Sequence, residues 1–108
     1  MLAKVGVEVT TDPVDGSVLS DKILSDNFDA YIWSNSSGPD PLKYLTCFHS
    51  KTAQSACNYV KFANPEFDRL IEAAGNETDP AKQNDLLRQA NNLLEEEAPV
   101  WFFTTTRL

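Results

Sequence analysis

Apolar side chains recur with helical spacing in two stretches of the chain that begin at Pro65 and Pro80. Each proline follows an Asx residue, Asn64 or Asp79, whose side chain can accept from the unpaired N–H groups of a first helical turn. The apolar positions are Phe67, Leu70, Ile71 and Ala74 in the first stretch, and Leu86, Leu87, Ala90, Leu93 and Leu94 in the second. This i, i+3, i+4, i+7 pattern predicts two amphipathic helices, each docked along one face.

Three shorter stretches have the pattern of β-strands. Residues 4–9 alternate apolar and polar side chains, residues 28–33 are aromatic and β-branched, and residues 100–105 follow a helix break at Pro99. Alternation with a period of two is typical of a strand with one buried face. The sequence therefore predicts three strands.

The remaining residues supply connections and two short helices. Apolar spacing predicts short helices over residues 17–25 and 42–48, while residues 34–41 contain only turn formers and predict a loop. Residues 49–62 are expected to be irregular. Leaving out the short helix over residues 42–48, the order of elements is β-α-β-α-α-β. This order predicts an α/β fold, with a small three-stranded sheet, flanking helices and parallel crossovers.

Length and charge narrow the possible functions. The chain has 108 residues, enough for a single domain with a modest core, and 42% hydrophobic residues argue against disorder. A net charge of −7 makes nucleic acid an unsuitable partner, because phosphate binding needs clustered Lys and Arg. No secretory leader and no apolar run long enough to span a bilayer is visible, which by itself predicts a cytosolic protein.

A series of motifs changes that interpretation. Asn64-Pro65-Glu66-Phe67-Asp68-Arg69-Leu70-Ile71, then Asp79-Pro80-Ala81-Lys82, a Leu-rich helix and Glu96-Glu97-Ala98-Pro99-Val100 follow one another in order. Upstream stand Val5-Gly6-Val7-Glu8-Val9, Asn27-Phe28-Asp29-Ala30, Trp33 and Asp40-Pro41. Together they resemble the C-terminal region of family 5 extracellular solute-binding proteins, the oligopeptide, dipeptide and nickel receptors of ABC importers.

The resemblance implies a role for the whole chain. Residues 1–108 would form a single domain, a fragment of the second lobe of a larger two-lobed protein with the type II periplasmic-binding fold. That protein would be exported to the periplasm or the extracellular face of the membrane. It would bind short peptides or another small solute without a cofactor, dock on an ABC permease, and not act as an enzyme.

The loop after Trp33 is the candidate ligand site. In open α/β sheets ligands bind beyond the carboxyl ends of strands, and this loop leaves such an end. Trp33 offers a large ring, and four polar side chains follow it: Ser34, Asn35, Ser36 and Ser37. From the residues alone, the favoured interpretation is that Trp33 belongs to the core with a polar turn after it. The resemblance implies that this segment lines the ligand cavity.

The same loop departs from the family pattern. An aspartate after this tryptophan commonly pairs with the peptide α-amine, but here no carboxylate precedes Asp40. Because a buried ammonium without a counter-charge is costly, either Asp40 takes that role or the ligand has no free amine there. Asp40 is better interpreted as the cap of the helix that begins at Pro41.

Cys47 and Cys57 are the only cysteines, and in an exported protein an even count predicts a disulfide. Two buried free thiols are the alternative. Zinc is not expected, because Cys47, His49 and Cys57 give three ligands instead of four. A Cys–His nucleophile lacks an identifiable orienting group. His49 is therefore expected to be a solvated side chain.

One alternative function comes from another class. The chain could be a small standalone α/β domain whose helices bind a partner protein. Under the receptor interpretation the isolated chain is expected to self-associate, because its sheet edges and apolar faces would lack neighbours.

Overall fold

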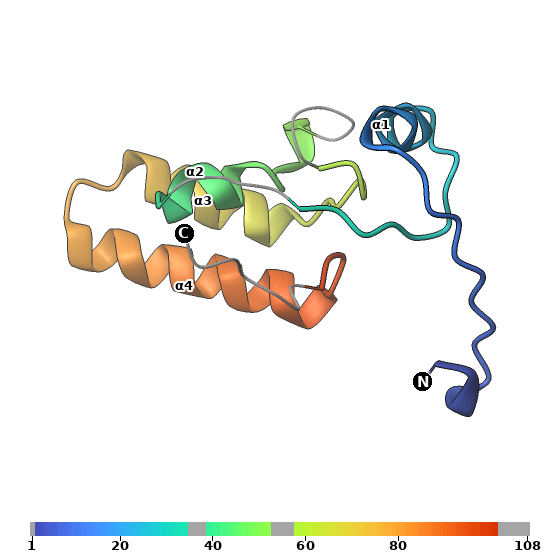
Figure 1. The fold of residues 1–108 in the computed structure, drawn as a ribbon. Coiled ribbons are helices and arrows are strands. Elements are labelled where there is room, and N and C mark those ends of the chain that lie inside the picture. Colours follow the sequence, from blue (N-terminus) through green and yellow to red (C-terminus); the bar gives the residue numbers. More distant parts are fainter. Residues whose placement is uncertain (1, 35–38, 53–57, 102–108) are drawn as a thin grey trace. The chain divides into compact units, whose positions relative to one another are not determined.

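The computed structural model describes residues 2–34, 39–52 and 58–101, which are helical with irregular connections (Figure 1). The chain divides into two compact units, Met1–Tyr31 and Ile32–Leu108. The first unit contains the 3₁₀ turn η1 (Leu2–Val5) and helix α1 (Gly16–Leu24). The second contains α2 (Pro41–Thr46), the 3₁₀ turn η2 (Ser50–Thr52), α3 (Pro65–Asn76) and α4 (Pro80–Glu97).

The first unit has little hydrophobic core. Helix α1 buries Ile23, whereas η1 buries no residue. The predicted helix over residues 17–25 is thus confirmed, one residue earlier at each end. The Phe28 and Tyr31 rings pack edge to face with their centroids 4.9 Å apart.

The second unit is a hairpin of α3 and α4 against which α2 packs, so that the three helices share one core (Figure 1). Both long helices begin where the Asx-Pro pairs predict. Asn64 Oδ1 accepts from the backbone N–H groups of Glu66 and Phe67 at 2.9 and 3.1 Å. Asp79 Oδ1 accepts from Ala81 N–H at 2.9 Å. Ala98 ends α4 in the left-handed conformation, with φ of 46°.

The core of this unit combines the predicted stripes with residues from the irregular segment. Its buried hydrophobic members are Leu45, Phe48, Phe62, Phe67, Leu70, Ile71, Ala74, Leu87, Ala90 and Leu94. Phe67 is fully buried, and its ring packs edge to face on Phe62 at 5.2 Å between centroids. The prediction that one face of each helix is buried is therefore confirmed.

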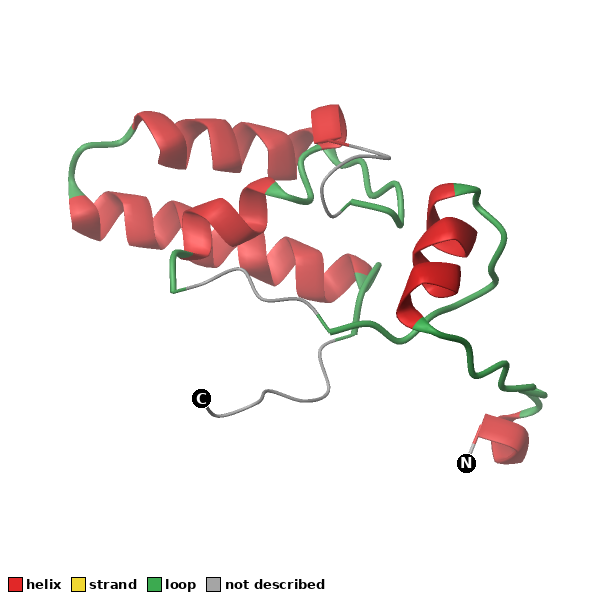
Figure 2. Ribbon diagram, turned by 45° about the horizontal axis from the view of Figure 1, so that its top comes forward, coloured by secondary structure: helices red, strands yellow, loops and turns green. Residues whose placement is uncertain are grey.

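The predicted α/β class is wrong for the part of the chain that the structure describes. Residues 2–34, 39–52 and 58–101 contain helices and loops but no β-strand (Figure 2). Residues 4 and 5 lie in η1, residues 6–10 and 28–33 have no strand assignment, and so do Val100 and Trp101. Residues 102–105 of the third predicted strand lie outside the described residues.

The physical reason is that a strand needs a partner. Alternating side chains specify which face would be buried, but the backbone N–H and C=O groups of a strand must pair with a neighbouring strand. Val5, Val7 and Val9 remain 74%, 47% and 57% exposed, so the alternating stretch has no sheet to pack into.

Candidate functional site

The predicted ligand-binding segment is only partly described. Trp33 is 49% exposed and Ser34 is exposed, while Asn35, Ser36 and Ser37 lie outside the described residues. The neighbouring Ile32 is 76% exposed. Trp33 is therefore not a core residue of the described structure, and its ring presents apolar surface at the start of the loop.

Asp40 caps α2, as the sequence indicated. Its Oδ1 atom accepts from the backbone N–H groups of Leu42 and Lys43 at 3.0 and 3.3 Å. Pro41 occupies the first turn, where its missing N–H costs nothing. The carboxylate is thus oriented toward the start of α2, and this contact accounts for an acidic residue at that position.

An open groove of about 320 Å³ lies between α2 and α4. Its lining mixes apolar and polar side chains: Pro41, Tyr44, Leu45, Asn84, Leu87, Arg88 and Asn91. Burial raises the pKa of the Tyr44 hydroxyl above its ordinary value of 10.0. Arg88 forms an ion pair with Asp85, one turn earlier on α4. Trp33 and Ser34, the two predicted ligand-binding residues that the structure describes, do not line this groove.

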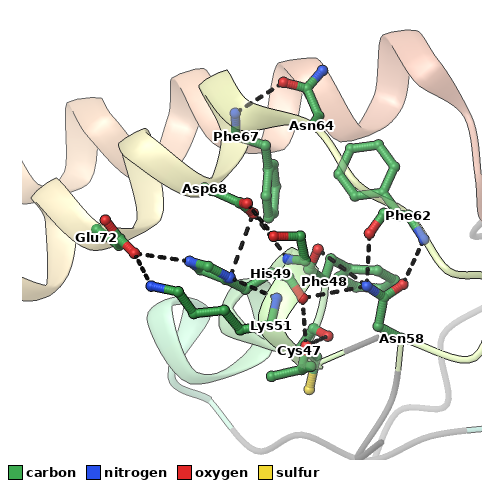
Figure 3. A network of polar contacts seen from close by, with 12 residues as sticks. Cys47, Phe48, His49, Lys51, Asn58, Phe62, Asn64, Phe67, Asp68 and Glu72 are labelled. Carbon is green, nitrogen blue, oxygen red and sulfur yellow. Dashed lines mark hydrogen bonds and ion pairs between the residues drawn. The ribbon is translucent and has the colours of Figure 1, made fainter. Parts of the chain in front are cut away.

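The densest polar cluster joins the segment after α2 to one face of α3 (Figure 3). His49 Nε2 lies 3.2 Å from Glu72 Oε1, and His49 Nδ1 lies 3.5 Å from Asp68 Oδ1. Ser50 donates to Asp68 through its backbone N–H at 2.9 Å and also through its hydroxyl. Lys51 Nζ donates to Glu72 at 2.7 Å. Asp68 and Glu72 are four residues apart, so they lie on the same face of the helix.

The expectation of a solvated His49 is wrong. The residue is only 7% exposed, because the segment that carries it folds back on α3. The Nδ1 atom accepts from Lys51 N–H at 3.1 Å, so the neutral ring carries its proton on Nε2, which donates to Glu72. Sequence spacing gave no indication of this, since His49 and Glu72 are 23 positions apart.

These contacts shift two pKa values. The hydrogen bond from Lys51, followed by that from His49, lowers the pKa of the Glu72 carboxyl below its ordinary 4.5. The hydrogen bond to Glu72 raises the pKa of the Lys51 ammonium above 10.5. Both side chains are solvent-exposed, so this ion pair shifts the two pKa values but contributes little to the free energy of unfolding.

Asn58 is a second residue that the sequence analysis missed. It is fully buried, and its amide bonds to the backbone of three residues, the consecutive Phe48 and His49 and the more distant Phe62 (Figure 3). Nδ2 lies 2.8, 3.3 and 3.4 Å from the carbonyl oxygens of Phe62, His49 and Phe48, and Oδ1 accepts from Phe62 N–H at 2.8 Å. A polar residue between Ala56-Cys57 and Tyr59-Val60 was the only sequence signal for it.

These side chains anchor an irregular segment. Cys47 is not a free thiol, but Cys57 lies outside the described residues, so their pairing stays a prediction.

Within residues 2–34, 39–52 and 58–101, no group of three or more His, Cys, Asp and Glu side chains could hold a metal ion. In the same residues, no helix is long and apolar enough to cross a membrane.

Comparison with known proteins identifies relatives. The chain is 31% identical over 106 residues to the oligopeptide-binding protein OppA of Bacillus subtilis, covering 94% of this chain and 19% of OppA. It is 32% identical over 105 residues to the oligopeptide-binding protein AppA of the same organism, with the same coverage of each. It is 27% identical to the peptide transport periplasmic protein SapA of Salmonella typhimurium, over 92% of this chain and 18% of SapA.

The chain thus spans about a fifth of the length of these relatives. No protein-family model and no solved structure matches it. The relatives confirm the resemblance derived from the motifs.

Proposed function

Because the chain belongs to the family 5 extracellular solute-binding proteins, we propose that it is a segment of the substrate-binding component of an ABC-type importer for short peptides. It is a binding protein and not an enzyme. One observation carries the proposal: proteins named for peptide binding or peptide transport match this chain almost from end to end.

The proposal extends to the architecture of the parent protein. Coverage of about a fifth of each relative supports a fragment of a larger receptor. The motif resemblance is the reason to place residues 1–108 in the second of two lobes. The hairpin of α3 and α4 provides a packed scaffold within that lobe. The parent would be exported to the periplasm or the extracellular face of the membrane, where it would deliver its ligand to a permease.

Trp33, Ser34, Asn35, Ser36 and Ser37 are proposed to line the ligand cavity. The half-exposed Trp33 ring supports this role, because an aromatic ring offers 150–250 Å² of contact area in general. Hydroxyl and amide groups next to such a ring can fix ligand orientation. Asp40 caps α2, which favours a ligand without a free amine near this loop.

The reading frame around the 108 codons tests the architecture. An upstream export signal and an opposing lobe would support the receptor. A frame limited to these residues would instead favour a small interaction domain. The intact protein can then be screened with short peptides by thermal shift, since a ligand that binds only the native state raises its apparent stability. Failure of every peptide to shift the melting temperature would contradict peptide specificity.

Replacing Trp33 with Ala in the intact receptor tests the site. We expect peptide affinity to fall by about tenfold or more, because an aromatic anchor at a binding site typically contributes at least 1.4 kcal/mol. The matched control is Leu87→Ala in the core of α4, which should cost about 2–5 kcal/mol of stability and leave the affinity of the folded fraction nearly unchanged. If Trp33→Ala lowers stability but spares affinity, the site assignment is wrong.

The isolated chain is also proposed to self-associate. Val5, Val7, Val9 and Ile32 are each between 47% and 76% exposed, and Trp101 is 77% exposed. Apolar side chains at such exposure favour association when no neighbouring lobe covers them. Light scattering at micromolar concentration should detect oligomers, and a strictly monomeric species would contradict the proposal.

A further inference from the structure

The Nδ1 atom of His49 has two neighbours of opposite kind, the Lys51 backbone N–H, which is a donor, and the Asp68 carboxylate, which is an acceptor. In the neutral ring, the Nδ1 lone pair accepts from Lys51 N–H at 3.1 Å. The same atom lies 3.5 Å from Asp68 Oδ1, slightly beyond hydrogen-bond distance. The ionised Asp68 carboxylate has no proton to donate to Nδ1. Nδ1 can therefore accept the hydrogen bond from Lys51 N–H only while it carries no proton.

Protonation reverses these preferences. A proton on Nδ1 makes it a donor, and two donors, Nδ1–H and Lys51 N–H, would then face each other. Asp68 Oδ1 becomes the suitable acceptor and needs only a shift of a few tenths of an ångström to come within hydrogen-bond range. On the opposite side of the ring, Nε2–H keeps its bond to Glu72, which becomes charge-assisted.

We infer that His49 is a proton-operated switch beside the 3₁₀ turn η2. Protonation of Nδ1 breaks its hydrogen bond with the Lys51 N–H, and Nδ1–H then donates to Asp68 instead. The charged groups that face the ring are Lys51 on its own segment and Asp68 and Glu72 on α3. Asn58 contributes an uncharged contact to the His49 carbonyl oxygen. The proton thus exchanges the bond from the Lys51 N–H to the His49 ring for a charge-assisted bond between the ring and Asp68 on α3.

Two structural features make the exchange possible. The turn η2 has three residues and buries none of them, so its geometry can change without opening the core. The hydrogen bonds from Lys51 and His49 lower the pKa of Glu72, which favours the ionised carboxylate that accepts from Nε2–H. The Nε2 side therefore holds the ring in place while the Nδ1 side changes partner.

The test follows the 108-residue chain by NMR from about pH 8 to about pH 5, the range in which histidine side chains change charge. Ring ¹⁵N shifts report which nitrogen is protonated, and hydrogen exchange reports the protection factor of the Lys51 amide. We expect a neutral Nε2–H tautomer at high pH. As Nδ1 is protonated, Lys51 protection should fall about fivefold, the effect of losing one ordinary hydrogen bond.

Variants on α3 separate the switch from a general effect of pH. In Asp68→Asn the anion that stabilises a protonated Nδ1 is lost, so protonation of Nδ1 and the loss of Lys51 protection should both require a lower pH than in the natural chain. Glu66→Gln, on the same helix but paired with Arg69, should behave like the natural chain. Constant Lys51 protection while Nδ1 takes up a proton, or a neutral ring with its proton on Nδ1, would overturn the inference. Both results come from the unmutated chain, so the test remains decisive if Asp68→Asn fails to fold.

Discussion

At the scale of single residues, the irregular segment between α2 and α3 depends on buried side chains that take the place of regular backbone pairing. Asn58 satisfies carbonyl oxygens of Phe48, His49 and Phe62 and the N–H of Phe62. A helix or sheet would pair such groups with other backbone groups, but here one amide does so. Phe48 and Phe62, whose backbone groups it binds, are also members of the core.

Replacing Asn58 with Ala should therefore be strongly destabilising. We expect a loss of about 3 kcal/mol in the free energy of unfolding, because buried backbone groups are left without partners. Urea unfolding measures this value. Asn92→Ala, at an exposed position on α4, is the matched control and should stay within about 0.5 kcal/mol of the natural chain. A cost for Asn58→Ala as small as that of the control would contradict the anchoring role.

At the scale of elements, the two long helices follow from local chemistry. Their starts are fixed by Asn64-Pro65 and Asp79-Pro80, and their buried faces by apolar residues at helical spacing. The two helices then stabilise each other, since Leu70, Ala74, Leu87 and Leu94 belong to one core. Gln83 Nε2 adds a bond from α4 to the Ala74 carbonyl oxygen on α3 at 2.9 Å.

The cap of α3 can be tested by itself. Asn64→Ala should lower the free energy of unfolding by about 1 kcal/mol, because the N–H groups of Glu66 and Phe67 lose their acceptor. Asn64→Ser keeps a capping oxygen and should retain most of the stability. Chemical denaturation of both variants gives the comparison. Equal loss in the two variants would show that the cap is not the source of the effect.

At the scale of the whole molecule, the predicted disulfide between Cys47 and Cys57 would close the segment that carries His49. On the chain-entropy model a loop of this size is stabilised by roughly 3 kcal/mol. Thr52 already ties the same segment internally, since its hydroxyl donates to the Cys47 carbonyl oxygen at 2.6 Å. A disulfide would add a covalent link to a segment that is otherwise held by single hydrogen bonds and one short 3₁₀ turn.

Thiol titration of the denatured, unreduced chain tests the pairing. We expect no reactive thiol before reduction and two after it. Reduction should also lower the midpoint of thermal unfolding, because the unfolded chain gains freedom. Two reactive thiols in the unreduced chain would contradict the disulfide and would weaken the proposed export of the parent protein.

The sequence by itself determined the helices, the cap at Asp40 and the family. Helix caps and apolar stripes depend on residues two to four positions apart, so they can be recognised without a three-dimensional structure. Asp40 reaches Leu42 and Lys43, two and three residues on. The ordered motifs identified the peptide-binding relatives for the same reason, because each motif is local.

Only the tertiary structure decided the strands and the polar cluster. Residues 4–9 alternate like a strand, but pairing requires a neighbour that the described residues do not provide, and the valines stay exposed. His49 looked like a surface residue until α3 brought Asp68 and Glu72 to its ring from 19 and 23 positions away. Contacts across such distances depend on how the chain folds back, which periodicity and local spacing cannot specify.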